Sequence, residues 1–281
     1  MKIPTSFQYL LVGAVLLILA GGTTYYVGYK LLQGANVIPE AYQTADGRSC
    51  NIAVVPLTGQ LWASQANADS QTTTNDSANT SAEVIVAALE RAKDAASIKG
   101  VVLRVDSPGG SPVGGEMIAN ALKNLGKPSD AVIEDEGDSA AYLASTGANV
   151  IIASPFSDVA DIGITSSYID QSGSITAEGE QFIQISDGKY KDVGDPDFPL
   201  SAAGKAYLQG LVDSDYKTLN QEVATNRSMS LSSVQALANG DSLTGAMAMG
   251  TGLIDKLGDL STVDQWFVTK LGKNSNPVLC D

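Results

Sequence analysis

Short apolar segments alternate with helical patterns along most of this chain, and that alternation limits the folds open to it. Runs of branched apolar residues typical of buried strands lie at Asn51–Leu57, Val101–Val105, Ala131–Ile133 and Val150–Ala153, with a later alternating strand at Phe182–Ile185. Helical spacing of apolar residues occurs at Val84–Ala96, Glu116–Leu125, Gly137–Thr146, Leu200–Arg227, Leu231–Leu237 and Thr262–Leu271. This order predicts an α/β body with a mainly parallel sheet, in which the polar stretch Gln60–Thr80 is a loop.

The N-terminal segment differs from the rest of the chain. Phe7–Leu32 contains 26 residues with no charge before Lys30, which is long enough for a helix to cross a bilayer. We expect an uncleaved transmembrane anchor at 1–32, followed by a juxtamembrane stretch at 33–50, a body at 51–272 and a C-terminal tail at 273–281. A cleavable signal peptide with a small-residue exit at Ala20–Gly22 is the main alternative, and a buried helix of a soluble domain is less favoured.

The acidic charge belongs to the body and not to the N-terminal segment. The chain has 17 basic and 31 acidic residues, a net charge of −14, and the first 30 residues contain no Asp or Glu. An acidic surface argues against nucleic acid as a partner, because phosphate binding needs clustered Lys and Arg. Either membrane interpretation sends the acidic body across the membrane, and the favoured uncleaved anchor predicts a single-pass protein with that body on the extracytoplasmic side.

The chain has no histidine. Its absence excludes Ser-His-Asp and Cys-His sites, histidine-ligated metals and imidazole relays. The sequence shows no metal-ligand spacing and no phosphate loop, so we expect no cofactor. A lysine that activates a serine is the remaining common alternative, and that lysine must be desolvated enough to become neutral.

Two cysteines, Cys50 and Cys280, flank the body. An exported body permits a disulfide between them, which would tie the start of the core to the C-terminus. Two unpaired thiols are an equally open interpretation.

Two segments carry residues suited to acyl transfer. In the first, a buried strand runs into Ser107–Gly110, whose glycines can turn backbone N–H groups toward a developing oxyanion. In the second, Ser139 precedes small residues at a helix start, where it is either a nucleophile or only an N-cap. Taken alone, each segment is better explained by an ordinary turn or cap.

In chain order, however, these segments resemble the signal peptide peptidase A family, which comprises membrane-anchored Ser-Lys peptidases of family S49. The resemblance extends over roughly Asn51–Gly258 and is carried by Leu103–Gly110, Ser139–Tyr142, Ile151–Pro155, Ile162–Ile164, Gly188–Asp192, Leu243–Ala248 and Gly252–Gly258. It implies a ClpP/crotonase-like fold, peptide substrates such as remnant signal peptides, and homo-oligomers whose active sites combine residues of neighbouring subunits.

Carried over by position, the resemblance implies that Ser139 is the nucleophile and Lys191 the general base, with Lys189 as the competing base. The backbone N–H groups of Gly109 or Gly110, together with that of Ala140, would form the oxyanion hole. The chain departs from the family pattern at Asp138, Ala140, Ala141 and Asp161, where the family has Ala, Gly, Gly and Ser.

These departures keep a second class of function open, namely a catalytically inactive homologue that acts as an oligomeric scaffold at the membrane. Carboxylates near the base would favour its ammonium form and oppose base function. The run Glu134–Glu136 adds negative charge, either beside the site or in a solvated loop. A crotonase-type acyl-CoA enzyme is a third hypothesis, against which the N-terminal apolar segment argues.

Overall fold

The computed structural model describes residues 49–70, 79–272 and 275–280, which belong to one compact unit spanning residues 42–281. The predicted anchor at 1–32 lies outside the described residues, as does nearly all of the juxtamembrane stretch. Within the described part of the chain, no helix is both long enough and apolar enough to cross a bilayer.

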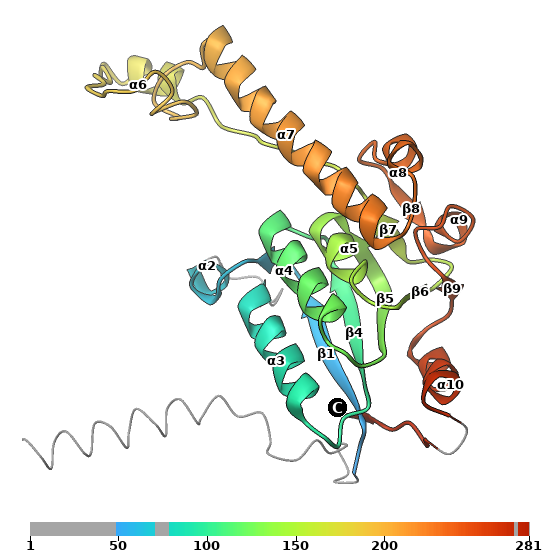
Figure 1. The fold of residues 1–281 in the computed structure, drawn as a ribbon. Helices are drawn as coiled ribbons and strands as arrows, with labels where there is room; N and C mark the ends of the chain where they lie inside the picture. Colours follow the sequence, from blue (N-terminus) through green and yellow to red (C-terminus); the bar gives the residue numbers. More distant parts are fainter. Residues whose placement is uncertain (1–48, 71–78, 273–274, 281) are drawn as a thin grey trace, which may run out of the picture. The chain divides into compact units, whose positions relative to one another are not determined.

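A largely parallel sheet forms the centre of the body (Figure 1). Its main path has the strand order β10-β1-β4-β5-β6-β9. These strands are β10 (Leu279–Cys280), β1 (Ile52–Thr58), β4 (Gly100–Ser107), β5 (Ser129–Asp138), β6 (Val150–Ala153) and β9 (Lys256–Leu257). Near its C-terminal end β5 also pairs with β7 (Asp158–Ala160), which pairs antiparallel with β8 (Ser242–Thr244). Two short strands, β2 (Leu61–Trp62) and β3 (Thr80–Ser81), form a separate pair.

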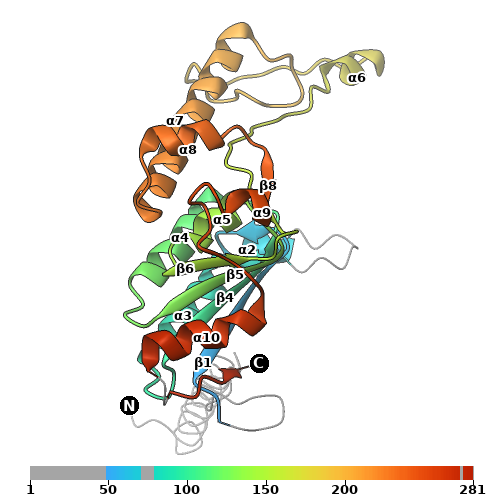
Figure 2. The ribbon, with the colours of Figure 1, turned by 90° about the vertical axis from the view of Figure 1, so that its right-hand side faces the viewer.

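Helices cover both faces of this sheet (Figures 1 and 2). One face is covered by α3 (Ala82–Asp94), α4 (Pro112–Lys123) and α5 (Ser139–Ser145), and the other by α10 (Leu260–Leu271). The remaining helices are α2 (Gln65–Ser70), α6 (Ser172–Ala177), α7 (Ala202–Asn226), α8 (Leu231–Leu237) and α9 (Gly245–Ala248). Because both faces are covered, β4 is buried along nearly its whole length, as expected of a central parallel strand.

The predicted α/β class and the main elements agree with the structure, although several bounds differ. Helix α4 begins at Pro112, earlier than predicted, because Ser111 caps it by accepting from the Gly114 N–H and proline suits the first helical position. The predicted loop at 60–80 contains β2 and α2. The predicted strand Phe182–Ile185 is wrong: these residues are exposed and form no regular element, since no neighbouring strand pairs with them.

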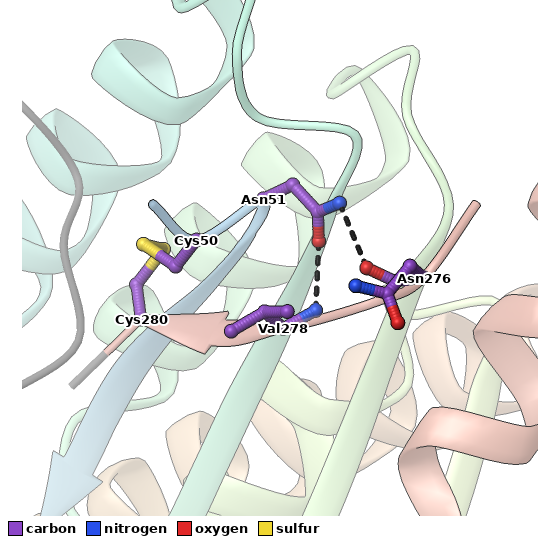
Figure 3. The surroundings of a disulfide bond; sticks show 5 residues. All are labelled: Cys50, Asn51, Asn276, Val278 and Cys280. Atoms are coloured by element: carbon purple, nitrogen blue, oxygen red, sulfur yellow. Dashed lines mark hydrogen bonds between the residues drawn. A yellow bond between two sulfur atoms is a disulfide. The ribbon is translucent and has the colours of Figure 1, made fainter. Parts of the chain in front are cut away.

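A disulfide joins Cys50 to Cys280 across 230 residues of sequence (Figure 3). The described residues near the C-terminus are held to the body, because β10 pairs with β1. The Asn51 side chain strengthens this contact by accepting from the Val278 N–H at 2.8 Å and donating to the Asn276 carbonyl at 3.2 Å. Of the two cysteine interpretations, the paired one is confirmed.

A buried carboxyl lies between the sheet and α10. Asp130 is fully buried, and neither of its carboxyl oxygens accepts a hydrogen bond from a described residue. Burial raises its pKa to about 8. The Lys256 charge lowers this pKa and the Asp255 charge raises it, and both effects are smaller than that of burial. A carboxyl in this position remains protonated at neutral pH.

We expect Cys280→Ser to lower the free energy of unfolding by about 2–5 kcal/mol, because a long loop in the unfolded chain is no longer closed. Denaturant unfolding of the detergent-solubilised chain measures the change. Cys50→Ser should have the same effect, and a reductant should destabilise the wild type but not the variants. Equal denaturation midpoints for oxidised wild type and Cys280→Ser would contradict the expectation.

We expect Asp130→Asn to remove a pH dependence of stability. Between pH 4 and 8 the unfolded state releases the Asp130 proton while the folded state retains it. The wild type should therefore lose up to about 1.4 kcal/mol per pH unit as the pH rises, and the loss should level off above pH 8.

Unfolding curves at several pH values, for wild type, Asp130→Asn and the control Asp264→Asn on the exposed face of α10, test this expectation. The control should follow the wild type. Parallel stability curves for wild type and Asp130→Asn between pH 4 and 8 would show that Asp130 ionises normally.

Candidate active site

Ser139 lies at the junction between strand β5 and helix α5. β5 ends at Asp138 and α5 begins at Ser139, so the serine follows the C-terminal end of a central parallel strand. Ligands of parallel α/β sheets bind at this edge. The Ser139 side chain is half-buried, which leaves it reachable from outside.

The backbone of Ser139 is in the left-handed region, with φ of 52°. This conformation costs a residue other than glycine about 1–3 kcal/mol and persists where the surrounding structure enforces it, often at functional sites. A sharp strand-to-helix turn of this kind exposes a serine hydroxyl at the edge of a sheet. The plain N-cap interpretation of Ser139 is wrong, since the cap position is occupied by Asp138.

The glycine turn after β4 packs directly against Ser139. Gly109 has φ of 91°, and a Cβ atom there would lie 2.9 Å from both Ser139 Cβ and the Ala140 nitrogen. A Cβ at Gly110 would lie only 2.2 Å from the Leu61 carbonyl oxygen. Only glycine fits at either position, so the turn and the serine form one tightly packed unit.

The two glycines differ in the availability of their N–H groups. The Gly109 N–H donates to Ser107 Oγ at 3.1 Å, whereas the Gly110 N–H has no hydrogen-bond acceptor among the described residues. The Ala140 N–H lies in the first turn of α5, where amides lack a partner within the helix. Of the predicted oxyanion donors, Gly110 and Ala140 are therefore the open ones.

Contacts on two sides hold α5 in place. On one side Gly115 of α4 lies so close that a Cβ atom there would be 2.4 Å from the Ala140 carbonyl oxygen. On the other side the buried Tyr142 donates its hydroxyl to the Leu253 carbonyl at 2.8 Å, and burial raises its pKa. The serine is thus carried on a helix that cannot shift freely.

The segment that carries Lys191 packs against the N-terminal part of α7, where the Tyr190 and Tyr207 rings stack with centroids 4.4 Å apart. Lys191 belongs to an exposed turn in which its own N–H donates to the Gly188 carbonyl, and no hydrogen bond joins it to Ser139 among the described residues. Lys189 lies over the Tyr190 ring at 4.8 Å. In both views the segment around α6 and the N-terminal end of α7 projects away from the sheet (Figures 1 and 2). One protomer therefore brings together Ser139, Gly109, Gly110 and Ala140 but not Lys191.

Several carboxyl groups lie close to Asp138, the residue directly before the serine. Asp138 is 8% exposed, and its Oδ2 accepts from Ser242 Oγ at 2.7 Å across β7. Burial raises the pKa of Asp138, and the charges of Asp161 and Asp158 add to this effect. Burial also raises the pKa of Asp161, with a further contribution from Asp241.

The run Glu134–Glu136 is not a loop, because it lies within β5. Arg104 of the neighbouring strand is 3.6 Å from Glu134. Burial raises the pKa of Glu136, as do the charges of Asp106 and Asp138. The negative potential that the sequence suggested is therefore built into the sheet edge that carries Ser139.

Among the described residues there is no group of three or more acidic or cysteine side chains placed to hold a metal ion. The cavity one helical turn from Ser139 is lined by Glu116, Asp215 and Glu222 and by no basic side chain. A basic pocket for a nucleotide, which an acyl-CoA enzyme would need, is not found there.

Sequence reasoning missed two features of the site. The left-handed backbone at Ser139 has no sequence signal, because strain of this kind depends on the surrounding tertiary structure. The Asp138–Ser242 hydrogen bond joins residues 104 positions apart, so no local pattern indicates it. The only hint in the sequence was the polar side chain of Asp138, directly before Ser139.

A peptidase family and several known proteases match this chain. Residues 121–272 match peptidase family S49. A putative protease of Methanocaldococcus jannaschii is 34% identical over 164 residues, which are 58% of this chain and 53% of that protein. A putative signal peptide peptidase SppA of Enterococcus faecium is 29% identical over 60% of this chain and 50% of its own length. Protease 4 of Haemophilus influenzae is 30% identical over 66% of this chain and 31% of its own length.

The chain thus spans about half the length of the first two of these relatives. The family match extends over more than half of the chain and includes both Ser139 and Lys191. The chain belongs to peptidase family S49.

Proposed function

We propose that the protein is a serine endopeptidase in which Ser139 attacks the peptide carbonyl and Lys191 is the general base. The observation that carries this proposal is the strained Ser139 at the β5–α5 junction, packed against a glycine turn with an open N–H at Gly110. A serine held in this way next to open backbone donors has the geometry that acyl transfer needs.

In the proposed mechanism, Lys191 Nζ accepts the Ser139 hydroxyl proton as Oγ attacks the substrate carbonyl carbon. The oxyanion of the tetrahedral intermediate accepts hydrogen bonds from the Gly110 and Ala140 N–H groups. Collapse expels the amine, to which the Lys191 ammonium returns the proton, and leaves an acyl group on Ser139. Water activated by neutral Lys191 then releases the acid and regenerates the enzyme.

The base would come from a second copy of the chain. Lys191 is exposed and forms no hydrogen bond with Ser139 among the described residues of its own protomer. Its segment also carries apolar side chains with few contacts, among them Ile169 (74% exposed), Ile183 (72%) and Ile185 (95%). Exposed apolar groups in such number mark a contact surface. We therefore propose a homo-oligomer in which the projecting segment of one protomer reaches the Ser139 site of its neighbour.

We further propose that residues 1–32 anchor this body to a membrane, with the body on the extracytoplasmic side, where it would cleave membrane-derived or unfolded peptides. The Cys50–Cys280 disulfide supports an oxidising compartment for the body. The names of the relatives, which include a putative signal peptide peptidase, support peptides as substrates.

A catalytically inactive scaffold is the second candidate. The observation that favours it is the acidic surrounding of Ser139, in which Asp138 and Asp161 would stabilise Lys191 as an ammonium.

We expect Ser139→Ala and Lys191→Ala each to lower kcat/KM for an unfolded peptide by at least about 10³-fold, because each removes a partner of the covalent step. Lys189→Ala, two residues away in the same exposed turn, is the matched control and should remain active. Labelling of Ser139 by a fluorophosphonate, read by intact mass, gives a second readout. An active Ser139→Ala variant, or an active Lys191→Ala beside an inactive Lys189→Ala, would contradict the assignment.

We expect inactive variants to complement each other. In oligomers reassembled from equal amounts of Ser139→Ala and Lys191→Ala chains, about a quarter of the shared sites would contain both wild-type residues, so activity should return to about that fraction. Peptide cleavage before and after mixing measures it, with each variant reassembled alone as the control. No recovery in oligomers shown by native mass spectrometry to be mixed would place both residues in one protomer.

A further inference from the structure

A groove opens one helical turn from the nucleophile, between α4, α5 and the C-terminal half of α7. It encloses a cavity of about 290 Å³. Its lining includes three apolar and three acidic side chains, namely Val113, Leu143, Leu219, Glu116, Asp215 and Glu222.

The position of the groove relates it to the reaction. Leu143 lies four residues after Ser139 on α5, which is about one helical turn along the helix. Val113 follows the Gly110 turn by three residues, at the start of α4. A peptide whose carbonyl is held between Ser139 and Gly110 would therefore direct a neighbouring side chain along α5 into this groove.

The floor of the groove is apolar. Leu143 and Leu219 are 3% and 5% exposed, which places them at its base, whereas Val113 is 57% exposed at its side. Such a floor accepts methylene groups and excludes their hydration water.

The rim of the groove is acidic. Glu116 belongs to α4, whereas Asp215 and Glu222 belong to two turns of α7. Of these three carboxylates, only Glu222 forms an ion pair within the described residues, with Lys123 at 4.0 Å. Glu116 and Asp215 have no ion-pair partner among the described residues, so the rim retains unbalanced negative charge.

We infer that this groove binds a lysine or arginine side chain of the peptide substrate. An apolar floor below a ring of carboxylates complements a side chain with an alkyl stem and a cationic end. The carboxyls of Asp138, Asp161 and Glu136 at the same edge of the sheet extend the negative field toward the scissile bond. This inference rests on the proposed function, because it supplies that reaction with a specificity-determining subsite.

The test uses the full chain in detergent and peptides that differ at one position. At each position on either side of the scissile bond, lysine, arginine, norleucine and glutamate are compared. Norleucine retains the alkyl stem of lysine without the charge, so the ratio of kcat/KM for lysine over norleucine isolates the effect of the ammonium group. At one position this ratio should be about tenfold and should fall with added salt.

Charge reversal in the groove should remove this preference. Glu116→Lys combined with Asp215→Lys should lower kcat/KM for the lysine peptide about tenfold and leave the norleucine peptide nearly unchanged. Asp213→Lys is the matched control, because Asp213 lies on the same helix, is exposed and does not line the groove. It should retain the preference.

Fluorescence anisotropy measures the affinity of the same peptides for Ser139→Ala, and so tests binding in the groove without cleavage. If no peptide is cleaved but lysine peptides bind more tightly than norleucine peptides, the proposed peptidase function fails and the groove assignment holds. If norleucine equals or exceeds lysine at every position in both assays, the groove is not a cation subsite. A change of oligomeric state in the double variant, with an unaltered lysine preference, would instead show that a second copy covers the groove.

Discussion

The pairing of β5 with its neighbours is the constraint on which the rest of the body depends. β5 pairs with β4 on one side and, on the other, first with β6 and then with β7, so that its C-terminal end is fixed from both sides. The chain then turns abruptly into α5, with Gly109 packed closely against Ser139 and the Ser139 backbone in the left-handed region. Because the strand cannot move and α5 is held by Gly115 and Tyr142, the strain remains at the serine instead of relaxing into the helix.

Patterns of burial explain which elements the sequence could predict. β4, β6, α7 and α8 have the apolar content or spacing that their environment requires, and each was predicted within a few residues of its bounds. The C-terminal half of β5 was missed because Glu134–Glu136 reads as a polar loop, although pairing with β4 and β7 keeps it extended. The short strands β7 to β10 depend on partners far away in sequence. Conversely, Phe182–Ile185 alternates as a strand should but has no partner strand, and its apolar side chains are exposed.

The same contrast between local patterns and distant contacts applies to the site. The order of a glycine turn, a serine and a lysine is local information, and the family resemblance that it carries selected Ser139, Gly109, Gly110 and Ala140, which the fold brings together. Which glycine amide is open depends on Ser107 Oγ, which accepts from the Gly109 N–H, whereas the Gly110 N–H has no acceptor in the described part of the chain. That difference, like the groove formed by α4, α5 and α7, involves side chains separated by tens of residues and has no signature in any single segment. The role assigned to Lys191 remains a prediction that needs a second protomer.

The acidic surrounding of Ser139 is most readily understood if cations arrive from outside the protomer. Desolvation and mutual repulsion raise the pKa of Asp138, Asp161 and Glu136, which means that the fold places these carboxyls where their charges are poorly compensated. A protein gains no stability from such an arrangement by itself. A lysine from a neighbouring copy and a basic side chain from a substrate would each supply the missing positive charge, and both would lower the pKa of these carboxyls on assembly or binding. Negative charge near Ser139 would then favour both assembly and substrate capture in the oligomer. The same charge would stabilise the ammonium form of Lys191, so that Lys191 becomes a neutral base only at higher pH.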